Sequence, residues 1–66
     1  MATEYAVTKY DYDENGNCIY KGQHRAPGAD EDDIYWIITK YVYDVNGNCE
    51  DKSMRTGSWT DRTSGW

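Results

Sequence analysis

TKYDYDENGNC, residues 8–18, returns 31 positions later as TKYVYDVNGNC, residues 39–49, with nine of the eleven letters unchanged. In each copy, a run rich in Tyr, Val and Thr leads into Asp-x-Asn-Gly, and a second run follows. Asn-Gly between two such runs is the strongest short signal for a β-hairpin. The repeat therefore predicts two hairpins, with Asn15-Gly16 and Asn46-Gly47 at the turns, because Gly adopts positive φ without steric cost.

Two turn geometries fit the first copy, and they place the side chains of the second strand on different faces. A two-residue loop pairs Asp13 with Cys18, whereas a three-residue loop with a glycine bulge pairs Tyr12 with Cys18. We favour the three-residue loop, because it separates apolar from charged side chains as a one-sided sheet requires. Its two faces are Tyr10, Tyr12, Cys18 and Tyr20 on one side, and Lys9, Asp11, Ile19 and Lys21 on the other.

The strand that opens the second hairpin is apolar on both faces. IYWII, residues 34–38, continues to Tyr43, and its alternation separates two apolar sets. Trp36, Ile38 and Val42 lie on one side, and Ile37, Tyr41 and Tyr43 on the other. Such a strand is typical of the centre of a sheet, covered on each face. The C-terminal tail, with Trp59 and Trp66, is the expected cover of one face.

These features predict an all-β fold in which two tandem hairpins form a small antiparallel sheet or open barrel, with the Trp-containing C-terminal tail packed on it. One hairpin cannot bury its own apolar face, which explains why the hairpin motif occurs twice. We expect a single domain over 1–66: hairpin 1 at about 4–21, a connector at 22–33, hairpin 2 at about 34–52 and the tail at 53–66. A chain of 66 residues buries little surface, so the sequence favours a self-partner or a host assembly.

Composition and charge exclude several classes of partner. The net charge is −5, and the acidic run at 30–33 is expected to be a solvated loop. Nucleic acid is not an expected partner, because phosphate binding needs clustered Lys and Arg. No apolar run of 18 residues and no charged-then-apolar N-terminus is present, so neither a membrane span nor a secretion signal is expected.

The candidate metal and redox residues have simpler interpretations. Asp11, Asp13 and Asn15 match the opening of an EF-hand loop, but the twelfth position, which needs a bidentate Glu, is Gly22. Turn chemistry accounts for the motif, and no metal or cofactor is expected. Two other residues of this kind, Cys18 and Cys49, are expected to be buried thiols, and a disulfide is the alternative if the two hairpin faces meet.

No group of residues resembles a reaction centre. The sole histidine, His24, lies in a polar stretch without a recognisable nucleophile beside it, and we interpret it as a solvated loop residue. The chain is too short to offer an obvious deep cleft that would perturb a carboxylate. The sequence therefore predicts a protein that is not an enzyme.

An ordered set of four motifs resembles small virion-associated or accessory proteins of tailed bacteriophages. The segments are YDYDENGN (10–17), APG (26–28), WIITKYVYDVNGN (36–48) and WTDRTS (59–64). A weaker resemblance is to tyrosine-aspartate repeat proteins, which share Y-D-x-x-G-N. The phage resemblance implies a head, neck or tail accessory protein, present in the host cytoplasm during production and then in the virion.

We therefore expect a non-enzymatic structural module that self-associates or binds other virion proteins. Tyr and Trp combine a large apolar body with a polar tip, which suits both protein interfaces and half-exposed sheets. The residues expected to supply core and contact area are Tyr10, Tyr12, Trp36, Tyr41, Tyr43, Trp59 and Trp66. The alternative is a glycan-binding protein for host recognition, in which exposed rings stack on sugars.

Overall fold

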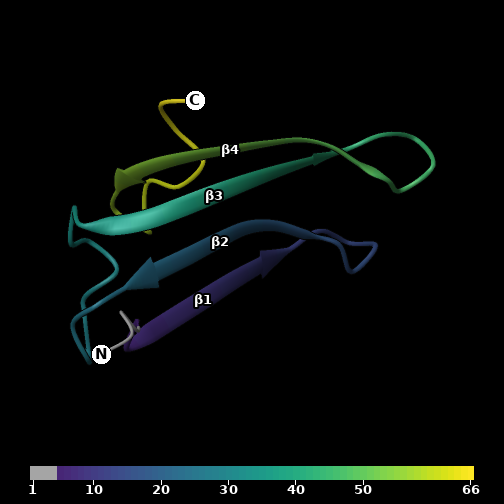
Figure 1. The fold of residues 1–66 in the computed structure, drawn as a ribbon. Coiled ribbons are helices and arrows are strands. Elements are labelled where there is room, and N and C mark those ends of the chain that lie inside the picture. The colour runs from purple at the N-terminus through teal and green to yellow at the C-terminus, as the bar shows by residue number, and fades with distance from the viewer. Residues whose placement is uncertain (1–4) are drawn as a thin grey trace.

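In the computed structural model, which describes residues 5–66, four strands form one antiparallel sheet. They lie across the sheet in chain order (Figure 1) as β1 (Val7–Tyr12), β2 (Cys18–His24), β3 (Trp36–Tyr43) and β4 (Cys49–Gly57). The all-β prediction of two tandem hairpins is confirmed, and the sheet is open, with β1 and β4 at its edges. The predicted start of the first hairpin, Glu4, lies outside the described residues.

Both hairpin turns have the predicted three-residue loop with a glycine bulge. The Asp13 N–H donates to the Asn17 carbonyl at 2.9 Å, and the N–H of Gly16, which has a φ of 84°, donates to the Asp13 carbonyl at 3.1 Å. The Asp13 carboxylate accepts two further loop N–H groups, each at 2.9 Å. Asp44 and Gly47 repeat these contacts in the second turn, so the repeated letters encode one turn structure.

An additional irregularity in the first hairpin changes the faces of β2. Tyr12 pairs with Cys18 as predicted, but Asp11 pairs with Tyr20, so Ile19 is an extra residue that forms a β-bulge. Beyond a bulge, the alternation of side chains is shifted by one residue. The predicted faces are therefore wrong from Tyr20 onward: this ring lies on the face of Asp11, and the lysine after it lies on the tyrosine face.

Strand lengths also differ from those predicted. β2 continues through His24, inside the predicted connector, and β3 begins at Trp36. β4 continues to Gly57, five residues into the segment assigned to the tail. Because β3 pairs with β2 and β4, its predicted central position is confirmed, but the expected cover on each face is wrong for residues 5–66, since Tyr10, Tyr12 and Met54 stay exposed on the side opposite Trp36.

One side of the sheet, the covered face, holds the core. Trp36 and Ile38 are fully buried there, and Trp59 from the C-terminal segment lies against them with its ring centroid 6.1 Å from that of Trp36. Gly22 of β2 lies beneath Trp59, because a Cβ at this glycine would lie 2.7 Å from ring atom Cζ3. The predicted packing of a Trp-bearing tail on the sheet is confirmed.

The cover of this face consists of two segments that are far apart in the sequence, the β2–β3 connector and the C-terminal segment. The Trp36 indole N–H donates to the Asp30 carbonyl at 2.8 Å, which ties the connector to the core. Thr60 joins the two segments, because its N–H donates to the Glu31 carbonyl at 3.0 Å and its hydroxyl donates to Asp32 at 2.7 Å. The acidic run is therefore an ordered part of the cover, and not only a solvated loop.

Arg62 ties the end of the chain to β1. Its guanidinium forms an ion pair with Asp11 at 3.0 Å and lies 4.6 Å from the centroid of the Trp59 ring. Trp66 donates its indole N–H to the Arg62 carbonyl and lies 5.1 Å from the Arg55 guanidinium. These contacts hold the C-terminal segment over the core.

Candidate functional site

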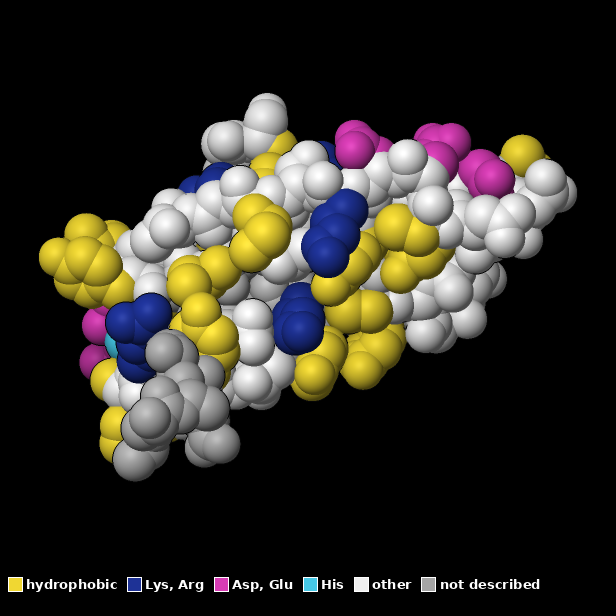
Figure 2. Space-filling model, viewed as in Figure 1, with side chains coloured by type: hydrophobic (Ala, Val, Ile, Leu, Met, Phe, Trp, Pro, Cys, Tyr) yellow, Lys and Arg dark blue, Asp and Glu magenta, His cyan; other side chains and the backbone are white. Residues whose placement is uncertain are grey.

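The side of the sheet opposite Trp36, which we call the open face, exposes a group of large side chains. Tyr10, Tyr12 and Met54 are between 52% and 62% exposed, and Tyr41 and Tyr43 are half-buried beside them. Figure 2 shows hydrophobic side chains gathered over the middle of this face, around two basic side chains. Adjacent aromatic and aliphatic side chains of this kind are a common feature of binding surfaces.

The open face is basic, although the chain is acidic. Lys21 and Lys52 lie on it, since they pair with Tyr10 and Tyr41 respectively. Two acidic residues of the strands lie on the opposite side of the sheet: Asp11 pairs with Tyr20, and Asp51 pairs with Val42. Within a chain of net charge −5, the open face therefore favours an anionic partner surface.

One thiol and one phenol at the turn end of the open face have raised pKa values. Burial raises the pKa of the Cys18 thiol, and burial also raises the pKa of the Tyr43 phenol, which donates to the Cys18 carbonyl at 2.6 Å. Cys18 and Cys49 are both free thiols, but Cys18 is half-buried and Cys49 is exposed, so the prediction of a buried thiol is wrong for Cys49. They lie on strands separated by β3, about 10 Å apart by strand spacing, which is beyond the reach of a disulfide.

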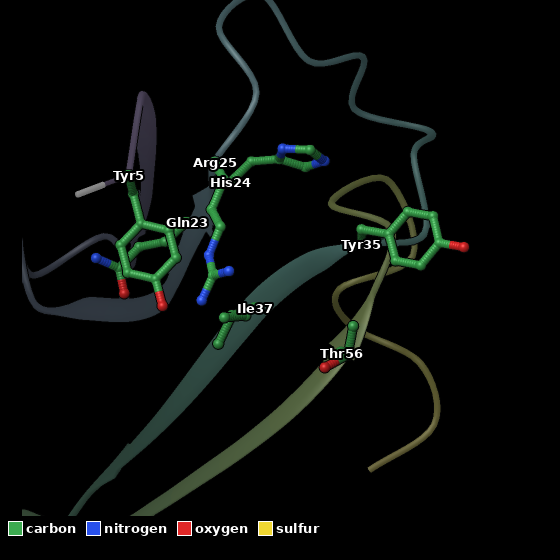
Figure 3. A pocket seen from close by; sticks show the side chains of 7 residues that line it. All are labelled: Tyr5, Gln23, His24, Arg25, Tyr35, Ile37 and Thr56. Atoms are coloured by element: carbon green, nitrogen blue, oxygen red, sulfur yellow. The ribbon is translucent and has the colours of Figure 1, made fainter. Parts of the chain in front are cut away.

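A cleft of about 330 Å³ lies where β2 ends and β3 begins. Its lining residues are Tyr5, Gln23, His24, Arg25, Tyr35, Ile37 and Thr56. Figure 3 shows the rings of Tyr5 and Tyr35 on opposite sides, with the Arg25 side chain between them, pointing toward Ile37. The cleft is therefore aromatic at its sides, aliphatic at its floor and cationic at its centre.

His24 belongs to the core, so its interpretation as a solvated loop residue is wrong. It is 7% exposed at the end of β2, with its ring edge-on to Trp36 at 5.2 Å. Its Nδ1 accepts the Ala26 N–H at 2.9 Å, and its Nε2 lies 3.4 Å from an Asp33 carboxylate oxygen. These contacts close the connector over the sheet; Nδ1 is hydrogen-bonded, whereas the buried Nε2 faces the Asp33 carboxylate without forming a hydrogen bond.

Asp33 makes stability dependent on pH. The Tyr35 N–H, which donates to this carboxylate at 2.8 Å, holds the pKa of Asp33 below its ordinary value of 3.8, and His24 acts in the same direction. Because the folded state has the lower pKa, the carboxylate stabilises the fold above pH 3.8, and this contribution is lost as the pH falls through the folded value.

We therefore expect Asp33→Asn to be less stable than the parent protein at pH 7, and this difference to shrink as the pH falls below about 4. Urea unfolding followed by Trp fluorescence at several pH values measures it. Glu14→Gln, in the exposed β1–β2 turn, is the matched control. A difference between Asp33→Asn and the parent that stays constant down to pH 2.5 would contradict the assignment.

The residues predicted as aromatic sites divide between core and surface. Trp36 and Trp59 are buried in the core, whereas Tyr10, Tyr12, Tyr41 and Tyr43 lie on the open face and Trp66 lies over Arg55 at the surface. The cleft residues Tyr5, Arg25 and Tyr35 were not predicted as a site. They are brought together by the β2–β3 register, and no local motif marks them.

Within residues 5–66, no group of three or more His, Cys, Asp or Glu side chains is arranged to hold a metal ion. No helix long and apolar enough to cross a membrane occurs in the described part of the chain. Comparison of the chain with protein-family models, with curated proteins and with solved structures finds no match.

Proposed function

We propose that this chain is a non-enzymatic interaction module of a bacteriophage particle, and that its open face binds a second copy of the chain. The observation that supports the proposal is the one-sided cover of the sheet. The connector and the C-terminal segment protect the face of Trp36, while Tyr10, Tyr12 and Met54 remain more than half exposed on the other face.

The available area is adequate for such a contact. Stable interfaces bury about 800 Å² on each partner, which is roughly one sixth of the accessible surface of 4650 Å². One face of a thin four-stranded sheet can supply this share. The Tyr rings there offer contact area at a low cost in conformational entropy.

Charge complementarity identifies which surface of the second copy fits. The open face carries Lys21 and Lys52, so two open faces would oppose like charges. The connector run at 30–33 and the pair Glu50 and Asp51 on edge strand β4 are mostly exposed and acidic. These two acidic groups lie at opposite ends of β3, and the open face of one copy therefore fits one of them on the next copy, in a head-to-tail arrangement that forms rings or filaments.

Tyr12→Ser tests the contact. We expect the parent chain to associate at micromolar concentration in sedimentation equilibrium, and the substitution to raise the dissociation constant at least about tenfold, as for a central interface aromatic. Val45→Ser is the matched control, because Val45 is 98% exposed in the β3–β4 turn, away from the open face. A monomeric parent, or an equal effect of both substitutions, would rule out the open face as the interface.

The salt dependence of association separates the two ways in which copies can meet. Added salt weakens a contact between Lys and Asp or Glu and strengthens a contact between two basic faces. Association that tightens with salt would therefore exclude the head-to-tail arrangement, while leaving the open face as the interface.

The proposal that the chain belongs to a bacteriophage particle is supported by the resemblance of its four ordered motifs, from YDYDENGN to WTDRTS, to those of small phage proteins. Mass spectrometry of purified particles tests it: peptides of this chain in a fixed ratio to a structural protein are expected. Their absence from intact particles would remove the virion from the proposal.

A second candidate function, a glycan-binding protein for host recognition, is favoured by one observation. The cleft between Tyr5 and Tyr35 combines two aromatic rings with the Gln23 amide, the Thr56 hydroxyl and the Arg25 guanidinium. This mixture of apolar faces and convergent polar groups is typical of small-ligand sites.

A further inference from the structure

We propose that the cleft between Tyr5 and Tyr35 binds a sugar ring that carries a carboxylate, such as a hexuronate, with Arg25 pairing the carboxylate. This inference rests on the second candidate function, and the Ile37 and Thr56 side of the cleft belongs to the open face. The cleft lies at the end of the sheet where β2 meets β3, whereas the tyrosines Tyr12 and Tyr43 lie next to the hairpin turns at the other end.

The size of the cleft limits the ligand. Its volume of about 330 Å³ is at the lower end of the range for small-molecule sites, about 300–1,000 Å³. A single ring with its substituents fits, and a longer oligomer would have to leave through the open side. The site is therefore suited to the terminal unit or to one internal unit of a glycan.

Charge selects an anion. None of the seven lining residues is acidic, and no carboxylate of residues 5–66 lies within ion-pair distance of Arg25. Its guanidinium lies 5.9 Å from the centroid of the Tyr5 ring and points into the cleft (Figure 3). A guanidinium presents parallel N–H donors that match the two oxygens of a carboxylate, so the cleft has a defined place for this group.

The walls select a ring with hydroxyl groups. Tyr35 exposes most of its ring, and Tyr5 faces it across the cleft, so an apolar sugar face has an aromatic surface to contact. The Gln23 amide, beside Tyr5, and the Thr56 hydroxyl, on the strand next to Ile37, supply donors and acceptors. Polar groups placed on several sides match a polyhydroxylated ring better than a simple carboxylic acid.

The experiment is an NMR titration of the ¹⁵N-labelled full chain with three probes: D-glucuronate, neutral D-glucose and acetate. We expect glucuronate to shift the Ile37 and Thr56 amides and the Arg25 side-chain N–H, and to bind more tightly than either other probe. Arg25→Gln should weaken glucuronate binding about tenfold or more, the loss expected for a charge-assisted hydrogen bond, and leave glucose unchanged.

Two further variants complete the test. Lys40→Gln removes a cation that lies over Trp66 on the covered face, outside both the cleft and the open face, and it should not change glucuronate binding. Tyr35→Ala removes a wall without removing the cation, and it should weaken both sugars. The spectrum of each variant shows that it is folded before titration.

Each contrary result has its own meaning. Equal binding of glucose and glucuronate, or no effect of Arg25→Gln, would overturn the acidic-sugar inference and leave glycan binding standing. Binding of acetate as tight as that of glucuronate would overturn sugar recognition. No shifts with either sugar would overturn both the inference and the second candidate function, while sedimentation of the parent chain would still report on self-association.

Discussion

Trp36→Ala is expected to remove a large fraction of the free energy of unfolding, about 3–5 kcal/mol at 25 °C. A domain of this size has a stability of roughly 3–10 kcal/mol, and truncating a buried Trp to Ala costs about 3–5 kcal/mol. Trp36 is 0% exposed, and it contacts both Trp59 and His24. Its indole N–H also holds the connector through the Asp30 carbonyl, so the substitution removes packing and releases part of the cover together.

Urea unfolding and far-ultraviolet circular dichroism measure this loss of stability. Two further variants separate the contribution of the ring from that of its hydrogen bond, and the core Trp from a surface Trp. Trp36→Phe keeps most of the ring but leaves the Asp30 carbonyl without its donor, so we expect a smaller loss of about 1–3 kcal/mol. Trp66→Ala removes a ring that is 39% exposed and lies over Arg55, and it should cost less than half as much as Trp36→Ala. Equal losses for Trp36→Ala and Trp66→Ala would contradict the location of the core.

The hairpin turns can be predicted from the sequence in detail because their structure is local. The Asp13 carboxylate binds loop N–H groups within four residues of itself, and Gly16 supplies the one positive φ that the loop needs. These interactions depend on adjacent letters and on no distant part of the chain. The same letters therefore specify the second turn at Asp44 and Gly47.

The faces of β2 cannot be predicted with the same certainty, because both sides of this sheet carry aromatic residues. The pattern does not penalise a one-residue shift, so the alternation of side chains does not reveal the bulge at Ile19 that moves Tyr20 to the covered face, although the second copy has the same bulge at Glu50. Ser53 to Gly57 also gives little signal, because β4 is an edge strand whose polar side chains are mostly exposed. Its strand conformation is determined by pairing with β3, a contact that only the folded chain contains.

The residues of the cleft illustrate the same limit on the functional side. Arg25 follows β2, and Tyr35 precedes β3, with the whole connector between them. They line one cleft because Gln23 pairs with Ile37 in the sheet. The ends of strands are the least certain feature of a sequence-based assignment. The predicted first hairpin ends near residue 21, which places Gln23 and Arg25 in the connector, so the prediction contains no pairing that would bring them close to Tyr35. One residue of β2 did indicate its environment in the sequence, because an isolated Gly in a strand indicates close approach of another group.

The isolated glycine of β2 is Gly22. Gly22→Ala is expected to destabilise the fold by about 1–3 kcal/mol, the usual cost of overpacking. A Cβ there would lie 2.7 Å from Trp59 Cζ3, closer still to Cε3, and 3.3 Å from Trp36 Cε3. Two rigid rings cannot give way as the end of a flexible side chain can, so Trp59 must leave its place. We expect a red shift of Trp fluorescence and a lower urea midpoint.

A double-mutant cycle shows whether Trp59 is the cause. In a Trp59→Ala background the two closest contacts are gone and only the 3.3 Å approach to Trp36 Cε3 remains, so Gly22→Ala should cost less than half as much as in the parent protein. Gly57→Ala is the matched control: its Cβ would lie 2.5 Å from Arg55 Nη1, the end of a flexible side chain, so a smaller loss than for Gly22→Ala is expected even though Arg55 Nη2 also donates to the Asp61 carbonyl. If Gly22→Ala destabilises the protein equally with and without Trp59, this indole does not pack on the β2 backbone, and another anchor must hold the C-terminal segment over the sheet.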